Sequence, residues 1–375
     1  MKKAFLLFLI LLLLIPCFPQ RNEEKLYPIF VNEKYGFINA KGEIVISPQF
    51  DFTDGFCDGL ALVQIGEKKF SFSNGKPTTT SGKLGFIDKT GRIVIEAKYD
   101  AALGFSEGLA RIRVIIPDSK NSRNSFNQKW GFINKKGELI IKPQFSFAEN
   151  FREGLAAVRI GDKWGFIDKT GKVIIPPRYD YTYGISDGIG LGFIFKGGTR
   201  SKPAEPKPFI FDKSGKVTNQ PKFHITEKFN EGLAPIVISG NWGVFDDQKW
   251  GFIDNKGNLA IKPQFDRALG FSEGLAPVNI NKWGYIDKTG RIVINLQFED
   301  AQRFSQGIAR IKINNEYGFI DSTGKIVIKP EFDDAYDFEG ELALAIKGNE
   351  TGYINKTGKF IWKSTEWKVY RIETE

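Results

Sequence analysis

One six-residue word recurs along the chain and limits what the chain can fold into. The word appears as KWGFIN at 129, KWGFID at 163 and 249, and KWGYID at 282, with variants KYGFIN at 34, KLGFID at 83, EYGFID at 316 and ETGYIN at 350. The words at 249, 282, 316 and 350 lie 33, 34 and 34 residues apart. A fixed period of this length indicates tandem structural repeats.

The repeat defines the domain organisation. A degenerate copy, Pro208 to Asp212, keeps the register through the middle of the chain. We expect a single domain over 21–375, with units starting near 34, 83, 129, 163, 207, 249, 282, 316 and 350, the ninth of them truncated. A unit of about 33 residues cannot bury enough surface alone, so neighbouring units must stack and share a core.

Each unit carries the signals of three short strands and tight turns. In the copy at Lys163, the word is followed by Asp168-Lys169-Thr170-Gly171, which is typical of an Asx-stabilised turn with glycine in the left-handed position. The next strand, Val173 to Ile175, is apolar on both faces, and we expect it to be buried on both. The third strand, as in 275–280, alternates, which predicts one solvated face.

These features predict an all-β fold, a tandem array of about eight to nine short three-stranded repeats that is curved and propeller-like. Leu26 to Val31 resembles a third strand without its own first two, whereas Gly352 to Ile361 resembles the first two without a third. Because these ends could complete one another, we favour a closed toroid over an open β-solenoid. Against closure, about nine units exceed the usual four to eight blades, and three strands per unit fall short of four.

The pattern K-W-G-F-I-D-K-x-G-K-I-V-I-x-P-x-F, followed by F-x-E-G-L-A, resembles the WG-repeat (KWG-repeat) family of bacterial β-repeat proteins. The resemblance covers nearly all of residues 26 to 365. It implies repeat architecture, frequent export and a binding or structural role, and it supplies no catalytic residues. The tryptophan is replaced at Tyr35, Leu84, Tyr317 and Thr351, and the Pro208 copy lacks Trp-Gly altogether.

The N-terminus is typical of an export signal. Lys2 and Lys3 precede an apolar stretch from Ala4 to Ile15, which is short for a spanning helix of about 20 residues. We interpret residues 1–20 as a signal peptide or as a lipid or membrane anchor, with Cys17 as the candidate lipid-attachment residue. The protein is therefore expected to be exported, and to be periplasmic, outer-membrane-associated or extracellular, with a membrane tether through the N-terminus left open.

Residues that could support catalysis are scarce. A single His224 excludes mechanisms that need two histidines, such as H-E-x-x-H zinc hydrolysis. Cys57 occupies the slot held by Ser106, Ser272 and Ser305 in other copies, so we expect a turn residue there. Gly188 to Gly192 lacks the spacing of a phosphate-binding loop. We therefore expect a protein that is not an enzyme and uses no cofactor or metal.

Repeated carboxylates allow two interpretations. Asp88, Asp168, Asp254, Asp287 and Asp321 could form a row of calcium ligands, but Asn39, Asn134 and Asn355 replace them, which favours turn chemistry. The glutamates of F-x-E-G, Glu107, Glu153, Glu231 and Glu273, recur in most units, whereas a catalytic pair occurs once. The alternative function is a glycan-active hydrolase or lyase with an Asp/Glu pair in a central cleft.

Tryptophans of the word are expected to fill the core rather than to stack on a ligand. We assign this role to Trp130, Trp164, Trp250 and Trp283. Trp362 and Trp367 lie outside the word and are better candidates for exposure.

Insertions provide the main functional indication. Three insertions interrupt the connection between the third strand and the next word: 67–82, 117–128 and 196–207. Because they occupy the same position within the repeat, we expect them to lie on one common rim. Their basic residues form a candidate binding rim: Lys68, Lys69, Lys120, Arg123, Arg200 and Lys202. The sequence predicts a non-catalytic binding or scaffold protein that contacts an anionic envelope glycan or another protein through this rim. Solvated loops without a partner are the alternative.

The formal net charge of +9 is a modest basic excess. It favours loose attraction to anionic surfaces rather than specific nucleic-acid binding.

Overall fold

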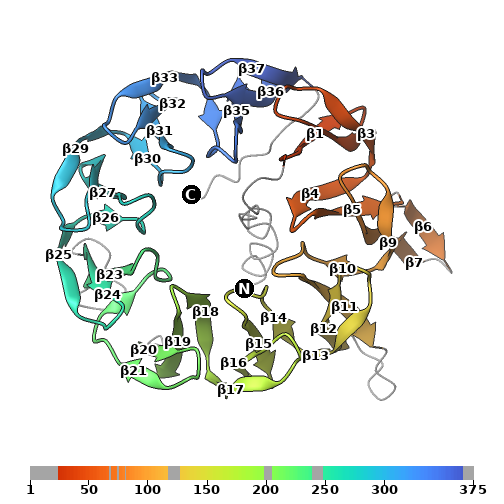
Figure 1. Cartoon of the computed structure of the whole chain (residues 1–375), viewed down its shortest axis with the longest axis horizontal. Coiled ribbons are helices and arrows are strands. Elements are labelled where there is room, and N and C mark those ends of the chain that lie inside the picture. The colour runs from red at the N-terminus through yellow and green to blue at the C-terminus, as the bar shows by residue number, and fades with distance from the viewer. Residues whose placement is uncertain are drawn as a thin grey trace. The chain divides into compact units, whose positions relative to one another are not determined.

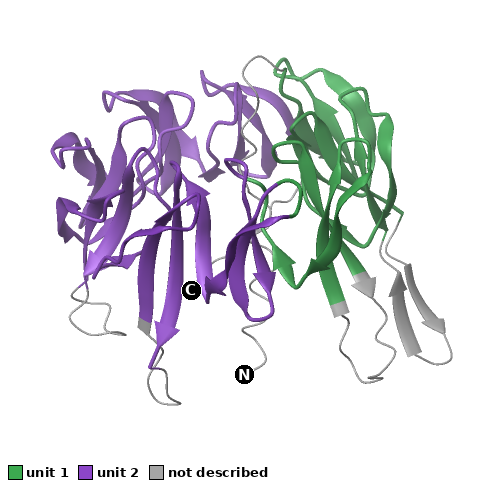
Figure 2. Ribbon diagram, turned by 60° about the horizontal axis from the view of Figure 1, so that its bottom comes forward, with its two compact units in different colours: residues 1–151, 169–171 green, residues 152–168, 172–375 purple. Residues whose placement is uncertain are grey.

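A computed structural model describes residues 24–66, 69–73, 76–80, 82–116, 127–197, 205–238 and 248–365. All regular structure in these ranges is β, and they contain no helix able to cross a membrane. The chain divides into two compact units, unit 1 with 1–151 and 169–171 and unit 2 with 152–168 and 172–375 (Figure 2). The expected signal or anchor, 1–20 with Cys17, lies outside the described residues.

Unit 1 contains the strands β1 to β14 (Figure 1). They are β1 (Tyr27–Val31), β2 (Lys34–Ile38), β3 (Ile44–Phe50), β4 (Phe52–Cys57), β5 (Leu60–Ile65), β6 (Lys69–Ser73), β7 (Lys76–Thr80), β8 (Lys83–Ile87), β9 (Ile93–Tyr99), β10 (Ala101–Ala102), β11 (Leu109–Ile116), β12 (Asn127–Asn134), β13 (Leu139–Phe145) and β14 (Phe147–Ala148). The antiparallel sheets have the orders β1-β2-β3 (sheet 1), β4-β5-β8-β9 (sheet 2) and β10-β11-β12-β13 (sheet 3), and β6-β7 is a separate hairpin.

Unit 2 contains β15 to β37. Its first strands are β15 (Ala156–Ile160), β16 (Lys163–Ile167), β17 (Val173–Tyr179), β18 (Tyr181–Ser186), β19 (Ile189–Lys196), β20 (Glu205–Asp212), β21 (Val217–Asn219), β22 (His224–Ile225), β23 (Leu233–Ile238), β24 (Lys249–Asp254) and β25 (Leu259–Phe265). The others are β26 (Arg267–Ala268), β27 (Ala276–Ile280), β28 (Lys282–Ile286), β29 (Ile292–Phe298), β30 (Asp300–Ala301), β31 (Ile308–Ile313), β32 (Glu316–Asp321), β33 (Ile326–Phe332), β34 (Asp334–Ala335), β35 (Leu342–Lys347), β36 (Glu350–Asn355) and β37 (Phe360–Ser364).

Sheets 4 to 9 follow in chain order within unit 2. Sheet 4 contributes β15-β16-β17, and sheets 5 to 9 have the orders β18-β19-β20-β21, β22-β23-β24-β25, β26-β27-β28-β29, β30-β31-β32-β33 and β34-β35-β36-β37. We name the four positions of a complete sheet A, B, C and D, from its first strand to its last. In sheet 1, β1 to β3 hold positions B to D, and in sheet 4 β15 to β17 do so.

The expectation of three strands per repeat is wrong, because complete sheets have four. The A strand is often only two residues long, as in β26 and β30, and it lies where the sequence indicated a turn. Repeat and sheet are also out of phase. The word forms the C strand, so one repeat supplies C and D of one sheet and A and B of the next.

The glycine of the word allows the C and D strands to approach closely. Trp164 pairs with Tyr179 and Phe166 with Ile175, so the D strand carries two extra residues opposite Gly165. A Cβ at Gly165 would lie 2.5 Å from the carbonyl oxygen of Ile175. Only glycine fits beneath this bulge, which explains its place in the word.

Burial of the B and D strands reverses the expectation from hydrophobic pattern. The D strand is not buried on both faces: its first residue is exposed by 57% at Ile44, 51% at Leu139 and 43% at Val173. The B strand, predicted to have a solvated face, is buried at Ala156, Ala157 and Val158. The D strand lies at the edge of its sheet, whereas the B strand has strand neighbours on both sides and packed sheet faces above and below.

The core lies between consecutive sheets of each unit. In most seams, the interfaces between consecutive sheets, an aromatic residue of one C strand meets the aromatic residue before the next A–B turn. The ring centroids are 4.8 Å apart for Phe86 and Phe105 in unit 1, and 5.0 Å apart for Phe252 and Phe271 in unit 2. These edge-on rings, together with Ala and Ile side chains of the B strands, form separate hydrophobic clusters between sheets.

Candidate functional site

The aspartates of the word occupy Asx turns. Oδ1 of Asp88 accepts hydrogen bonds from Thr90 N at 3.0 Å and Arg92 N at 3.2 Å, and from the Thr90 hydroxyl. That hydroxyl is the main cause of the lowered pKa of Asp88. Asn39 Oδ1 accepts the same two hydrogen bonds, from Lys41 N and Glu43 N. Asparagine can replace aspartate here because the turn needs only an acceptor oxygen. The described residues contain no group of three or more potential metal ligands.

The acids of F-x-E-G connect consecutive sheets. Glu153 lies in an A–B turn at φ 52°, followed by Gly154 at φ 86°, which is the left-handed pair of a two-residue hairpin turn. Its carboxylate accepts a hydrogen bond from Gly188 N of the next A–B turn at 3.0 Å and pairs with Lys213 Nζ of the next C–D turn at 2.9 Å. Carboxylate, glycine N–H and lysine together form what we call the acid clamp.

Other seams repeat the acid clamp. Asp58 contacts Gly108 N and Lys135 Nζ in unit 1, at 2.5 and 2.9 Å. Glu231 contacts Gly274 N at 3.0 Å and Lys288 Nζ at 3.1 Å in unit 2. These carboxylates therefore lie in turns and hold neighbouring sheets together.

The residue before the clamp acid makes a second contact between sheets. The Ser106 hydroxyl donates to the Phe151 carbonyl at 2.7 Å, and the Ser272 hydroxyl donates to Phe304 O at 2.8 Å. Cys57 pairs with Leu60 as Ser106 pairs with Leu109, so it holds the same structural slot. His224 lies on the A strand of sheet 6, where burial lowers its pKa.

The lysine of the word closes its own sheet. Lys163 Nζ lies 2.6 Å from Asp180, which follows the D strand 17 residues later, and Lys249 Nζ lies 2.6 Å from Asp266. The second oxygen of Asp180 accepts a hydrogen bond from Phe195 N at 2.9 Å. The word thus encodes a strand, its bulge, its turn and this ion pair.

The glycine-rich segment 188–192 serves packing. A Cβ at Gly190 would collide with the ring of Phe211, and one at Gly192 with the ring of Tyr179. These two rings stack with centroids 4.9 Å apart and planes inclined by 12°. In this degenerate copy the C strand carries the large residue Phe211, and the glycines that make room for the rings, Gly190 and Gly192, lie on the B strand. In the regular word the glycine lies on the C strand.

Tryptophans of the word pack against the hydrophobic clusters between sheets, and Trp130 also lies beside cationic side chains. Trp130 is 8% exposed, while Trp164, Trp250 and Trp283 are half-buried and pack against hydrophobic clusters. Arg111 and Arg113 both lie 5.6 Å from the Trp130 ring centroid. Trp362 is half-buried in β37, and Trp367 lies outside the described residues.

Arg111 is a fully buried cation that sequence reasoning missed. Its Nε donates to Asn150 Oδ1 at 2.8 Å, Nη1 donates to the Ala148 carbonyl, and Glu149 lies 3.7 Å away. Burial lowers its pKa to about 10. The Leu-Ala-Arg-Ile-Arg pattern offers one signal, because its two arginines alternate with buried apolar residues.

A charged network joins A strands of unit 2. Arg303 pairs with Glu227, and its Nε donates to the Gly270 carbonyl at 3.1 Å, so the ion pair passes over the intervening A strand. Burial first, and then repulsion by Arg152 and Arg303, lowers the pKa of Lys228 to about 8. These residues occur once each and do not belong to the repeated motifs.

The predicted rim residues lie mostly beyond the described ranges. Lys69 begins β6, and nothing is described of its side chain. The other five, Lys68, Lys120, Arg123, Arg200 and Lys202, lie outside the described residues. What the structure places is the base of each insertion, which is the B–C connection in sheets 2, 3 and 5.

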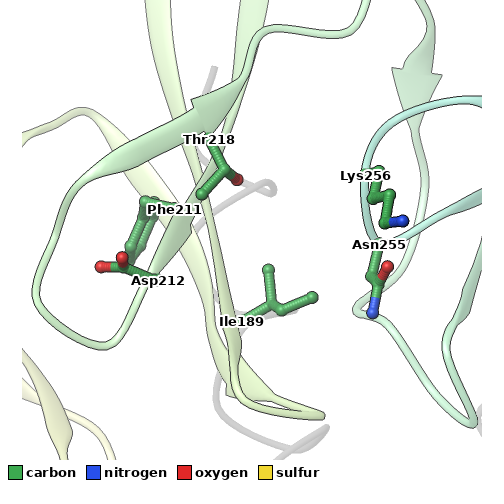
Figure 3. A pocket seen from close by; sticks show the side chains of 6 residues that line it. All are labelled: Ile189, Phe211, Asp212, Thr218, Asn255 and Lys256. Atoms are coloured by element: carbon green, nitrogen blue, oxygen red, sulfur yellow. The ribbon is translucent and has the colours of Figure 1, made fainter.

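One pocket lies between sheets 5 and 6 of unit 2, and sequence reasoning did not identify it. Its volume is about 260 Å³, and Ile189, Phe211, Asp212, Thr218, Asn255 and Lys256 line it (Figure 3). The nearest signal in the sequence is the degenerate copy at Pro208, whose D strand β21 has only three residues.

Antiparallel four-stranded sheets in tandem define a β-propeller type of repeat fold. The sequence predicted the propeller-like array, although not the fourth strand. Eight segments match the family model described as "WG containing repeat": 35–68, 85–114, 130–164, 164–199, 210–242, 250–282, 283–317 and 317–350. The chain belongs to the WG-repeat family.

Among solved structures, the chain is similar to "the eukaryotic initiation factor", with 12% identity and a TM-score of 0.58 over 92% of this chain and 96% of that one. It is also similar to Pyrococcus horikoshii acylaminoacyl peptidase, with 11% identity and a TM-score of 0.37 over 88% of this chain and 58% of that one. The extracellular domain of a one component system from B. thetaiotaomicron gives 11% identity and a TM-score of 0.32 over 92% and 59%. The first likeness concerns the fold alone, and the other two carry no argument. No curated protein matches the sequence.

Proposed function

We propose that the protein is an exported binding or scaffold protein without catalytic activity, which contacts an anionic envelope glycan or another protein through its B–C connections. The observation that carries this proposal is the placement of the insertions. In sheets 7 and 8 the B and C strands are joined by Asn281 alone and by Asn314-Asn315. The B–C connections of sheets 2, 3, 5 and 6 hold all the long insertions, and we call these four the B–C rim.

Long strands support the insertions. Five residue pairs join β15 to β16, whereas eight pairs join β11 to β12 and eight join β19 to β20. The two long hairpins therefore extend beyond the packed part of their sheets. A rigid framework that carries variable loops at one position is the usual arrangement of a binding surface.

Charge favours an anionic partner. The insertions of sheets 2, 3 and 5 carry the six predicted rim cations, and the whole chain has a formal charge of +9. A fourth insertion, 239–247, instead contains Asp246 and Asp247, so the basic character belongs to the first three. Basic loops attract polyanions at long range and hold them through salt-sensitive contacts.

The engaged state of the repeated carboxylates supports a non-catalytic role. Turn aspartates accept backbone hydrogen bonds, and the F-x-E-G acids form acid clamps. The proposed export rests on Lys2, Lys3 and the apolar stretch that follows them.

Capture from envelope extract tests this function. The chain from 21 to 375 is immobilised, and the glycan and protein fractions that it retains are analysed separately. A variant without residues 197–206 provides the comparison, and its thermal unfolding is measured beside the wild type. We expect the wild type to retain one dominant envelope component that the folded deletion variant loses. Equal retention by both would remove the B–C rim of sheet 5 as the site.

A further inference from the structure

Seams between sheets follow one rule in both units. An isoleucine of the D strand packs against the glycine of the next C–D turn, so that a Cβ on Gly290 would lie 3.0 Å from Ile261 Cγ2 and one on Gly324 would lie 3.0 Å from Ile294 Cγ2. The same contact joins Ile46 to Gly91 and Ile95 to Gly137 in unit 1. A branched aliphatic side chain thus fills the turn end of these seams.

The seam between sheets 5 and 6 departs from this rule. Its D strand, β21, has three residues where β25 and β29 have seven, and Asn219 contacts Gly257 in place of isoleucine. The Asn219 amide donates to the carbonyl of Lys256, which fixes the turn. The lysine of the acid clamp is also missing, because Asn255 stands at its turn position.

These substitutions leave the pocket of about 260 Å³ described above. Figure 3 shows Ile189 and Thr218 on one side and Asn255 with Lys256 across from them. The pocket lies at the end of the sheets that carries the A–B and C–D turns. The B–C rim lies at the opposite end, because each C strand runs from the B–C connection to the C–D turn.

Chemistry of the lining residues defines the ligand. Ile189 offers an apolar surface, Thr218 a hydroxyl and Asn255 an amide. The ammonium of Lys256 interacts electrostatically with the Asp254 carboxylate, but it forms no salt bridge within 4.0 Å among the described residues. The Thr218 hydroxyl donates to the Ile210 carbonyl at 3.2 Å, which leaves its oxygen lone pairs as acceptors. Asp212 uses Oδ1 in its Asx turn, with Ser214 and Lys216 as donors.

We propose that this pocket binds a single carboxylate-bearing sugar of the uronic acid type. Lys256 pairs with the carboxylate, Asn255 and Thr218 bind ring hydroxyls, and Ile189 packs on the apolar face of the ring. The volume is suited to one ring and not to an oligosaccharide. This small-molecule site is distinct from the B–C rim and does not depend on the function proposed for the rim.

Titration calorimetry with D-glucuronate tests the proposal, with D-glucose as the neutral probe. We expect glucuronate to bind the full chain and Lys256→Gln to weaken binding at least about tenfold, the effect of losing one charge-assisted hydrogen bond. Lys136→Gln is the matched control, because Lys136 holds the same turn position beside a regular seam. Thr218→Trp, which blocks the pocket, should abolish binding while the melting temperature stays unchanged.

Three results would overturn the proposal. The first is the absence of binding heat at a glucuronate concentration 50-fold above a Kd of about 1 mM. The second is an equal loss of affinity in Lys136→Gln and Lys256→Gln. The third is that glucose binds as tightly as glucuronate. Because none of these changes touches the B–C rim, envelope capture by the rim is unaffected by either outcome.

Discussion

Glu153 and Lys213 form an ion pair of 2.9 Å that links the A–B turn of one sheet to the C–D turn of the next. Both residues belong to repeated motifs, and their sequence separation of 60 reflects the offset between repeat and sheet. Each repeat supplies strands to two sheets, so the motif residues hold neighbouring sheets together through the covalent chain and the acid clamp.

Removal of one acid clamp should lower stability modestly. In Glu153→Gln the ion pair with Lys213 is lost, while the Gly188 N–H keeps an amide oxygen as acceptor. The expected loss is about 1 kcal/mol in the free energy of unfolding, since the pair is partly exposed. Gln306 stands naturally in this slot, so Gln306→Glu is the mirror variant and should gain up to about 0.5 kcal/mol by pairing with a turn lysine. Chemical denaturation measures both, and a loss above about 3 kcal/mol would contradict a surface clamp.

The glycine of the word should tolerate no side chain. In Gly131→Ala the new Cβ would lie 2.5 Å from Ile141 O and 2.7 Å from Pro143 N, both backbone atoms that cannot move aside. We expect a loss of more than about 3 kcal/mol or failure to fold. Gly154→Ala is the comparison, because its Cβ would meet nothing within 4 Å and only its φ of 86° is unfavourable, at a cost of about 1 kcal/mol. Equal effects at the two positions would argue against the close approach under the bulge.

Trp130→Ala should be among the most destabilising tryptophan changes. Its side chain is 8% exposed and lies against Arg111 and Arg113, so the variant loses a packed ring and two cation–π contacts. The expected loss is about 3 to 5 kcal/mol. Trp164→Ala, at a half-buried position, should cost less. Urea denaturation of both variants checks the order, and an unchanged Trp130→Ala curve would exclude a core role.

Asp54 should make stability depend on pH. Burial raises its pKa to about 7, although its carboxylate accepts a hydrogen bond from Leu62 N at 3.2 Å. Between about pH 4 and 7 the folded carboxyl keeps a proton that the unfolded chain has lost, so its contribution to stability falls as the pH rises through this window. Asp54→Asn should therefore gain about 2 to 4 kcal/mol relative to the wild type between pH 4.5 and pH 8. A constant difference between the two proteins over that range would contradict the raised pKa.

Sequence reasoning recovered the repeat and the turns, because each depends on local chemistry written in the repeated motifs. It did not predict that the F-x-E-G acids join neighbouring sheets, since those contacts lie far apart in the sequence. It misplaced burial, since Val173-Ile174-Ile175 is apolar throughout and yet its first residue faces solvent. The hydrophobic pattern of a strand indicates which side chains it can bury. It does not indicate whether the strand lies at the edge of its sheet. Sequence reasoning also missed the two-residue A strands, which have too few residues for a period.

The pocket was beyond sequence reasoning for a related reason. It arises where Asn219 replaces an isoleucine and Asn255 replaces a lysine, and the effect appears only when the two turns meet across a seam. Arg111 was missed because arginine on a strand with alternating pattern is normally solvated, whereas here both faces of the strand are covered.

The affinity of the B–C rim for an anionic envelope glycan tests the central claim most directly. Binding of a purified acidic glycan is measured for the wild type and for a variant in which Lys68, Lys69, Lys120, Arg123, Arg200 and Lys202 are all replaced by glutamine. A control variant loses the same charge through glutamine at six turn lysines outside the acid clamps and the pocket: Lys41, Lys89, Lys136, Lys172, Lys216 and Lys325. We predict that the rim variant loses at least about tenfold in affinity and that the control loses less than about threefold, because short-range contacts exceed the effect of net charge. Equal losses, or no loss in the rim variant, would contradict the account.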